Sequence, residues 1–393
     1  MKAAPRTLLG MSKEELADFA ESIGEKRYRG TQLFGWLYSR GATSFEGMTD
    51  LGKAFRTRLA ASARIGTLQP VRHSVSDADG TTKYLFALED ELQIESVLIP
   101  PASAFRRGEG EEGDDEQQRL TLCVSTQVGC PLDCAFCATG TMGFGRNLTT
   151  GEIVEQFLLA RRLSRRKITN VVFMGMGEPL LNYGSVMAAA GIFSDGLGVS
   201  GKRITVSTAG IAPKIRQMAD EKQKPKLALS LHSAVEGTRA LLMPITKKYG
   251  VAALREALEH YYRTVERRVT YEVIFFDGIN DTDAEVRALI SFARHIPCKI
   301  NVIPFHSIAF TGAGGTTARL RPSKKQERIV ERLRAEHLTV MVRSSAGEDI
   351  EGACGQLAVV EGGRHDRTKG SVRTSDTNEE SYATPSPRPP RGR

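Results

Sequence analysis

Three cysteines stand close together in the run TQVGCPLDCAFCATG, residues 126–140. Cys130, Cys134 and Cys137 fall within eight consecutive positions of a 393-residue chain that holds six cysteines in all. Thiolates are soft ligands that favour zinc, copper(I) or iron–sulfur clusters. In a long chain without a secretory signal, such a group predicts metal ligands or reactive thiols rather than a disulfide framework.

The spacing of these cysteines favours a cluster over a single ion. Zinc usually takes four protein ligands in two separated pairs, whereas this pattern offers three on one loop, directly after a predicted strand. Three thiolates on a four-iron cluster leave one iron open, and an open metal position is typical of catalysis. The alternative is a structural zinc site that is completed by Cys123 or a histidine.

The segments that must position this loop alternate between apolar, strand-like runs and helical patterns. The predicted strands are LTLCVST, ITNVVFMG, RITVSTAG, KLALSLH, VTYEVIFF and KINVIPF, and the helices that follow them are predicted at 151–163, 183–194, 213–221, 250–263, 283–294 and 323–336. Six such units predict an α/β fold whose parallel sheet curls into a partial (β/α)6 barrel. In such folds the chemistry lies at the C-terminal ends of the strands.

Polar or flexible residues stand at those expected strand ends. Gly177 and Glu178 combine a pliable backbone with a carboxylate suited to an ammonium group. Ser207 and Ser230 offer hydroxyls, and His232 offers a neutral donor or acceptor. Each one alone is a weak signal, because a glycine-rich strand end is more often a turn and a lone histidine more often structural. Their occurrence at successive strand ends is what favours one shared site.

Four parts of the chain are expected. Residues 1–64 read as a small helical RNA-binding module, with Ser12 and Glu15 in a capping-box pattern. Residues 65–119 predict a β-hairpin-like extension with a DADG turn, followed by an acidic loop over 106–119. Residues 120–360 form the expected barrel with a C-terminal cysteine loop. The polar, proline-rich segment 361–393 is expected to be a disordered tail.

Charge and composition indicate a polyanionic partner. The net charge is +8, and residues 1–64 carry 11 Lys/Arg against 7 Asp/Glu. Basic residues interleaved with aromatics at 26–29 and 36–40 suit RNA phosphates and bases, while the alternative is a solvated helix face with Trp36 and Tyr38 in the core. No apolar run is long enough to span a membrane and the start lacks a signal-peptide core, so we expect a cytoplasmic protein that enters no membrane.

The cysteine motif, with Phe136 before its last cysteine, resembles that of the radical S-adenosylmethionine superfamily. The resemblance implies that Cys130, Cys134 and Cys137 ligate a [4Fe-4S] cluster whose open iron binds S-adenosylmethionine. More specifically, TLCVSTQVGCPLDCAFCATG, MGMGEPL, STAG, LALSLH, PITKKY, KINVIPF and ACGQL together resemble the bacterial ribosomal RNA adenine-C2 methyltransferases and their adenine-C8 relatives. This likeness runs from residue 12 to about residue 357.

The family likeness implies a role for each remaining site residue. Cys354 would accept a methyl group from one S-adenosylmethionine, and a second molecule would yield a radical, so that two are used per turnover. Cys123 would attack the sulfur of Cys354 to release the product, and Glu95 would accept a proton. The implied cofactor-binding residues are Gly177, Glu178, Ser207, Ser230, Leu231, His232 and, where the C2 enzymes commonly have asparagine, His306.

The likeness also implies the partners. These are 23S rRNA, some tRNAs and an electron donor such as a flavodoxin-type reductant, and the protein is expected to be a monomer. Two alternatives stay open at this point. One is an adenine-C8 methyltransferase, which would share the cluster and both extra cysteines. The other is a non-catalytic iron–sulfur or zinc RNA-binding protein on a barrel scaffold.

Overall fold

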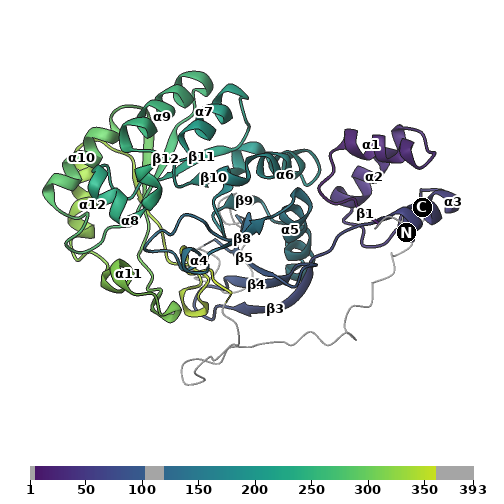
Figure 1. The fold of residues 1–393 in the computed structure, drawn as a ribbon, viewed down its shortest axis with the longest axis horizontal. Helices are drawn as coiled ribbons and strands as arrows, with labels where there is room; N and C mark the ends of the chain where they lie inside the picture. The colour runs from purple at the N-terminus through teal and green to yellow at the C-terminus, as the bar shows by residue number, and fades with distance from the viewer. Residues whose placement is uncertain (1–4, 102–118, 360–393) are drawn as a thin grey trace, which may run out of the picture.

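The computed structural model describes residues 5–101 and 119–359, and its dominant feature is one curved sheet with helices on its outer face (Figure 1). The strands are β1 (Arg6–Thr7), β2 (Ala63–Arg64), β3 (Gln69–Val75), β4 (Thr82–Ala87), β5 (Gln93–Ile99), β6 (Thr121–Cys123), β7 (Gln127–Gly129), β8 (Phe144–Asn147), β9 (Asn170–Phe173), β10 (Ile204–Thr208), β11 (Lys226–Ser230), β12 (Val269–Val273), β13 (Cys298–Val302) and β14 (Val340–Val342). The tail predicted at 361–393, and nearly all of the acidic loop predicted at 106–119, lie outside the described residues.

The helices cover one side of this sheet and form the N-terminal part of the chain. They are α1 (Lys13–Ser22), α2 (Tyr28–Phe34), α3 (Lys53–Ser62), α4 (Ala138–Thr141), α5 (Thr150–Ser164), α6 (Tyr183–Asp195), α7 (Ala212–Asp220), α8 (Glu236–Leu242), α9 (Val251–Val265), α10 (Asp283–Ala293), α11 (Gly315–Arg319) and α12 (Gln326–Ala335). Each of the six helices predicted after a strand is confirmed to within three residues, as α5, α6, α7, α9, α10 and α12.

The main sheet has ten strands in the order β14-β13-β12-β11-β10-β9-β6-β5-β4-β3. All neighbours from β6 to β14 pair in parallel, and each new strand is added on the same side of the one before it. A parallel sheet that never reverses its direction of growth curls towards a barrel, because the crossover helices all lie on one face. The expected partial barrel is therefore confirmed, with β14 as an additional last strand.

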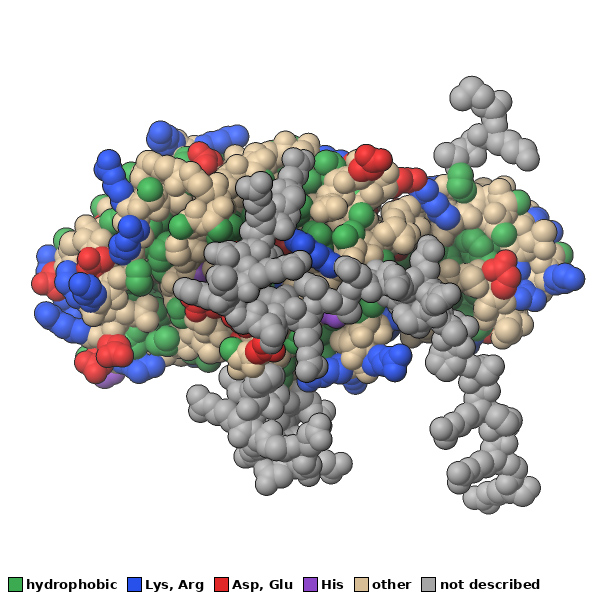
Figure 2. All heavy atoms as spheres, turned by 90° about the horizontal axis from the view of Figure 1, so that it is seen from below, with side chains coloured by type: hydrophobic (Ala, Val, Ile, Leu, Met, Phe, Trp, Pro, Cys, Tyr) green, Lys and Arg blue, Asp and Glu red, His purple; other side chains and the backbone are tan. Residues whose placement is uncertain are grey.

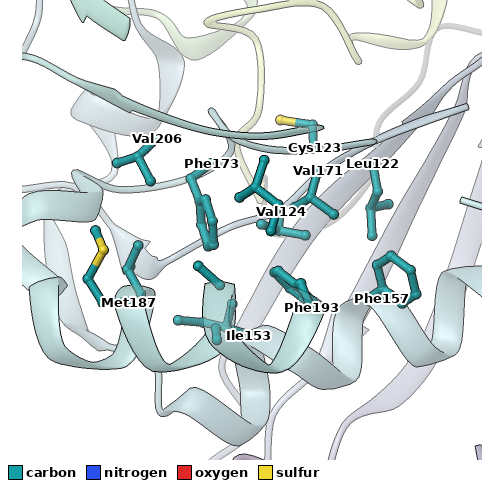
Figure 3. Close-up of a cluster of buried hydrophobic side chains, with 14 of the residues drawn as sticks. Leu122, Cys123, Val124, Ile153, Phe157, Val171, Phe173, Met187, Phe193 and Val206 are labelled. Atoms are coloured by element: carbon teal, nitrogen blue, oxygen red, sulfur yellow. The ribbon is translucent and has the colours of Figure 1, made fainter. Parts of the chain in front are cut away.

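Strand β6 separates the helical layer from the barrel interior. Figure 3 shows Leu122 and Val124 pointing towards Ile153 and Phe157 of α5 and Phe193 of α6, whereas the Cys123 side chain points to the opposite face. This is the two-residue alternation of a strand. Leu122 and Val124 are fully buried. The apolar outer side of the strand thus fixes the direction in which the thiol of Cys123 points.

The extension predicted before residue 119 continues the same sheet. β3, β4 and β5 form an antiparallel meander, and β5 pairs antiparallel with β6 over Val97↔Cys123. The expected DADG turn between β3 and β4 is present, and its Asp79 carboxylate accepts from the amide of Thr81 at 2.9 Å. The meander is therefore bonded directly to the first barrel strand.

The N-terminal helices form a module beside α5 and α6 (Figure 1). The predicted capping box is confirmed, because Ser12 and Glu15 each accept from the other's backbone amide at the start of α1. Gly10, at φ 95°, lies against Gly151 of α5, where a Cβ atom would come within 2.4 Å of the Gly151 nitrogen. This close backbone approach fixes the module on the barrel. No helix in the described ranges is long and apolar enough to cross a membrane.

Candidate active site

The three-cysteine loop is framed by the small β7–β8 hairpin and by α4. The Cys130 amide donates to the Gly143 carbonyl at 2.8 Å, the Ala135 amide donates to Leu242 at 2.9 Å, and Cys137 stands at the N-cap of α4. All three thiols are free and partly exposed. The loop is thus held by its backbone, and none of its three cysteines is tied up in a disulfide.

The donor set fits an iron–sulfur cluster. Burial raises the pKa of the Cys130 thiol to about 12 and that of Cys134 well above its usual range, and for both thiols neighbouring cysteines add to the rise. Thiols in this setting need a bound cation to ionise, since a coordinating metal deprotonates its thiol ligands. No three His, Cys, Asp or Glu side chains in the described part of the chain converge tightly enough to hold one metal ion. The three thiols of this loop would instead hold an iron–sulfur cluster, which cysteine thiolates ligate in proteins.

Glu178, at the end of β9, ties two strand ends together. Its Oε1 accepts from the Leu180 amide at 2.9 Å and its Oε2 accepts from the Ala209 amide at 2.7 Å. The side chain is buried, and this burial raises the pKa of the carboxyl, while hydrogen bonds from Ala209, Thr208 and Leu180 oppose the rise. The carboxylate predicted to hold an ammonium group therefore already orders the backbone of the site.

His232 is buried against the cysteine loop. Its ring packs on Phe136 with the ring centroids 4.4 Å apart, and its Nδ1 accepts from the Ile274 amide at 3.1 Å. Burial, followed by the charge of Arg239, lowers the pKa of His232 to about 3, so the ring is neutral at physiological pH. With Nδ1 as the acceptor, the proton is assigned to Nε2. The neutral donor predicted at this strand end is thus present.

The other predicted cofactor residues lie at or just after the C-terminal ends of the neighbouring strands β9, β10 and β11. Gly177, Ser207 and Ser230 are partly exposed, whereas Leu231 is buried. Arg239, which is fully buried, donates to the carbonyls of Ala209, Ser230 and Leu231. These backbone oxygens already have partners, so the two serine hydroxyls and the His232 ring are the groups that remain for a ligand.

Cys123 and Cys354 line one small cavity of about 30 Å³ inside the curled sheet. Its other lining residues are Val97, Ile99, Met174, Ile303, Pro304, His306, Arg343, Ser344, Ser345, Ala346, Gly352, Ala353 and Leu357. The two cysteines stand more than two hundred residues apart in the chain. Burial raises the pKa of Cys123 to about 12, and the nearby Cys354 adds to this rise. The structure therefore brings together both of the extra thiols singled out in the sequence.

His306 lines the same cavity, at the position where asparagine was expected. Its side chain is 3% exposed. Nδ1 faces Oε1 of Glu348 at 3.3 Å, without the geometry of a hydrogen bond. Glu348 lies six residues before Cys354. His306 thus contacts the cavity and also the segment that leads into the Cys354 loop.

Arg343 was missed by the sequence analysis. It directly follows β14, lines the cavity with both cysteines, and places Nη1 at 3.8 Å from Sδ of Met174. Its pKa is raised by Cys354 first, then by Glu272 and Cys123, against the effect of burial. The guanidinium therefore supplies a fixed positive charge beside two thiols, and it opposes the rise that burial causes in the pKa of Cys123. Nothing in the local sequence VMVRSS distinguishes this arginine from the many surface ones.

Glu95, on β5, is buried next to the Cys354 loop. Its Oε1 lies 3.2 Å from Nζ of Lys83, and its Oε2 accepts from the Ala358 amide at 3.0 Å. Burial raises the pKa of the carboxyl, and the charge of Lys83 is the largest effect in the other direction. A carboxylate with a raised pKa is a better proton acceptor than an exposed one. The geometry thus suits the role expected for Glu95.

The Cys354 loop docks directly on the start of α4, beside the cluster ligands. The Ala138 amide donates to the Gly355 carbonyl at 2.7 Å, and the Thr139 hydroxyl donates to Leu357 at 2.6 Å. Gly355 has φ 85°, and a Cβ atom there would stand 3.0 Å from the Phe136 carbonyl oxygen. The two cysteine-bearing loops are therefore one packed unit.

Two residues of the N-terminal module, Tyr38 and Arg27, have partners within the protein. Tyr38 is fully buried and donates to the Met11 carbonyl, so it belongs to the core and is not a stacking platform. Arg27 is ion-paired with three carboxylates of α1, those of Glu14, Asp18 and Glu21. On the face drawn in Figure 2, Lys and Arg are interspersed with Asp and Glu rather than gathered into a stripe.

Comparison with known proteins gives consistent matches along the chain. Residues 6–65 match the family model of the ribosomal RNA large subunit methyltransferase N-terminal domain, and residues 124–290 match that of the radical SAM superfamily. A probable dual-specificity RNA methyltransferase RlmN of Flavobacterium psychrophilum is 42% identical, over 91% of this chain and 99% of its own. The dual-specificity RNA methyltransferase RlmN of Halorhodospira halophila is 41% identical, over 91% and 94%.

A solved structure resembles the whole described fold. The crystal structure of a radical SAM methyltransferase from Sphaerobacter thermophilus superposes with a TM-score of 0.79 at 38% identity, and the match covers 90% of this chain and 99% of the other.

Proposed function

Because this chain belongs to the RlmN family of radical S-adenosylmethionine enzymes, and so is an S-adenosylmethionine-dependent RNA methyltransferase, we propose that it methylates carbon 2 of adenosine. The proposed substrates are one adenosine of 23S rRNA and the adenosine next to the anticodon of some tRNAs. The observation that carries this proposal is the shared cavity of Cys123 and Cys354. A route through a methylated cysteine needs these two thiols within reach of each other.

The superfamily implies a [4Fe-4S] cluster and S-adenosylmethionine, and Cys130, Cys134 and Cys137 are the residues that would hold the cluster. When bound, these groups would supply a transferable methyl group and a 5′-deoxyadenosyl radical. Carbon 2 of adenine has no lone pair with which to displace a methyl group from a sulfonium. The protein must therefore carry the methyl carbon on a residue of its own before the carbon reaches the base.

Cys354 is that carrier in this proposal. Its thiolate sulfur forms the bond to the methyl carbon while the bond from that carbon to the sulfonium breaks, and the guanidinium of Arg343 lies in the same cavity. After one hydrogen atom is removed from the methyl group on this sulfur, the methyl carbon bonds to the adenine and links protein to RNA. The adduct must then lose one electron, which the cluster would accept when bound, and one proton. Two molecules of S-adenosylmethionine are used in each turnover.

Glu95 and Cys123 complete the reaction. Glu95 takes the proton from the substituted carbon of the base, which suits its raised pKa. Cys123 then attacks the sulfur of Cys354, the methylated RNA leaves, and a disulfide remains that an external reductant must open. A flavodoxin-type electron donor is the partner we propose for the reductive steps. Ribosomal and transfer RNA would be met in the cytoplasm, and we propose that the protein acts as a monomer.

The remaining site residues would bind S-adenosylmethionine. Ser207, Ser230 and the Nε2 proton of His232 are the free polar groups at the strand ends, beside the backbone of Gly177. Glu178 and Leu231 would contribute by holding that backbone in place. His306, at the usual asparagine position, presents a ring in place of an amide, so it would offer a single hydrogen bond.

Nucleoside analysis tests the proposed function. RNA from a strain without this protein should lack 2-methyladenosine, and the purified, reconstituted protein should restore it in 23S rRNA and in tRNA. The appearance of 8-methyladenosine in place of 2-methyladenosine would instead identify a C8 enzyme. Failure to release 5′-deoxyadenosine with dithionite and S-adenosylmethionine would favour a non-catalytic RNA-binding protein.

A further inference from the structure

Lys83 joins the antiparallel meander to the Cys354 loop and to the presumed proton acceptor. Its Nζ lies 3.2 Å from Oε1 of Glu95, and it donates to the carbonyl of Glu351 at 3.3 Å. The other carboxylate oxygen of Glu95 accepts from the Ala358 amide at 3.0 Å. Lys83 and Glu95 thus hydrogen-bond to the loop on both sides of Cys354, at Glu351 and at Ala358.

The strand pairing fixes this arrangement. Lys83 pairs with Val97 across β4 and β5, while Glu95 pairs with Leu85, so the two charged residues are diagonal neighbours on one face of the sheet. The Lys83 and Glu95 side chains are only 12% and 3% exposed. A third contact, from the Gly347 amide to the Asp79 carboxylate at 2.9 Å, ties the start of the loop segment to the β3–β4 turn. The segment is thus bound to the meander at three points, Gly347, Glu351 and Ala358.

A buried ion pair of this kind rarely adds stability, because removing both charges from water costs as much as their attraction returns. We therefore expect the charges of Lys83 and Glu95 to serve the reaction rather than the stability of the fold. Burial disfavours an ionised Glu95, and the positive charges that oppose this effect are that of Lys83 and, more weakly, that of Arg72 on β3. On β6, the titratable side chain on this face is Cys123, which pairs with Val97 two residues further along β5. Lys83 is therefore the main cation that keeps Glu95 charged.

We propose that Lys83 is a positioning residue for the proton-accepting step: it holds Glu95 ionised and fixes that carboxylate to the loop that carries Cys354. This inference rests on the proposed function and names a residue that the sequence did not single out. In the step itself, the C–H bond of the base breaks, its electron pair stays on the base, and an O–H bond forms on Glu95. The neutral Glu95 then pairs more weakly with Lys83, which loosens the loop when Cys123 must reach the sulfur of Cys354.

The test is the pH dependence of single-turnover methyladenosine formation by reconstituted protein. A base works only when ionised, so activity falls as the pH drops through the pKa of Glu95. Without the cation of Lys83 that pKa lies higher, and the acid limb of Lys83→Met should move up by about one pH unit or more, since an opposite charge at this range has effects of about 1–3 units. At pH values below both acid limbs this corresponds to a loss of roughly tenfold, and the loss disappears as the pH rises above them.

Four further variants make the result specific. Lys83→Arg keeps the charge and should keep the wild-type profile, whereas Glu95→Gln should be inactive at every pH. Lys83→Gln is a second neutral variant, judged in the same way if Lys83→Met does not fold. Lys325→Met is the matched control, because Lys325 also pairs with a buried carboxylate, that of Asp281 at 3.5 Å, but away from the cavity. Its profile should be unchanged.

Hydrogen exchange supplies a readout that does not depend on turnover. The Ala358 amide should exchange faster in Lys83→Met than in Lys83→Arg, because a protonated Glu95 is a weaker acceptor. The proposal is overturned if a folded neutral variant keeps the wild-type pH profile, or if it is equally inactive at every pH. Wild-type protein that forms no methyladenosine at any pH would instead overturn the proposed function.

Discussion

The chain holds two groups of thiols that are built in different ways. Cys130, Cys134 and Cys137 share one short loop, held by backbone hydrogen bonds to Gly143, directly before β8 of the β7–β8 hairpin, and to Leu242 of α8. Cys123 and Cys354 come from the first barrel strand and from a loop after the last one, and meet in a cavity with Arg343. The first group is set by eight consecutive residues, although Leu242 and Gly355 also bond to its loop, whereas the second group forms only when residues from distant strands meet. The predictions below test this difference.

The largest effect should come from the local group. Replacing Cys134 by Ala removes one of three cluster ligands, so the iron–sulfur absorbance and all release of 5′-deoxyadenosine should be lost together. Circular dichroism should show an unchanged fold, because these thiols only line the site. Turnover retained after loss of any one of the three cysteines would refute the ligand assignment.

Substitutions of the two distant cysteines, Cys354 and Cys123, should block the reaction at two different steps. Cys354→Ala should keep the cluster but form neither methylated protein nor product, because the acceptor sulfur is absent. Cys123→Ala should still bond to RNA and then stall, which gives a protein–RNA band on a denaturing gel. The double variant should lose that band. A band that survives in it, or normal turnover by Cys123→Ala, would contradict the assigned roles.

A smaller effect should report on the charge inside the cavity. With its pKa raised to about 12 by burial, Cys123 should react with iodoacetamide slowly, and its rate should rise about tenfold per pH unit between pH 7 and 9 as the thiolate fraction grows. Arg343→Met should slow this reaction further, since the guanidinium opposes the rise in pKa. Mass spectrometry of the modified peptides measures both rates. Cys298, whose pKa burial raises to about 11, is the internal control and should not respond to the substitution.

The smallest effect should come from the contact between the two groups. Gly355→Ala places a Cβ atom at a positive φ and 3.0 Å from the Phe136 carbonyl, so the Cys354 loop should dock less well on α4. A cost of about 1 kcal/mol or more is expected where alanine meets such a backbone. The measurable result is faster hydrogen exchange at Ala138, whose amide donates to Gly355, with little change at the cluster. Unchanged exchange there would mean that the loops are independent.

These two groups also explain what the sequence could and could not predict. The cluster loop could be predicted because its three cysteines fall within eight consecutive residues. The barrel helices could be predicted because apolar residues recur at helical spacing along each one. β14 was missed because VMV is three residues long and two of them are exposed. Lys83 and Arg343 could not be identified from the sequence, because their roles depend on contacts with residues that are far away in the chain. For Tyr38, the sequence left two interpretations open, and its burial decides for the core.

The strictly sequential order of the strands has a consequence for synthesis on the ribosome. Each parallel strand from β6 onwards can pair with a neighbour that has already been made, so the sheet can grow as the chain emerges. The loop that closes the cavity is the last described part to appear, and it docks on the meander and α4, which are made much earlier. A nascent chain cut short before β14 would therefore contain the complete cluster loop but no methyl acceptor.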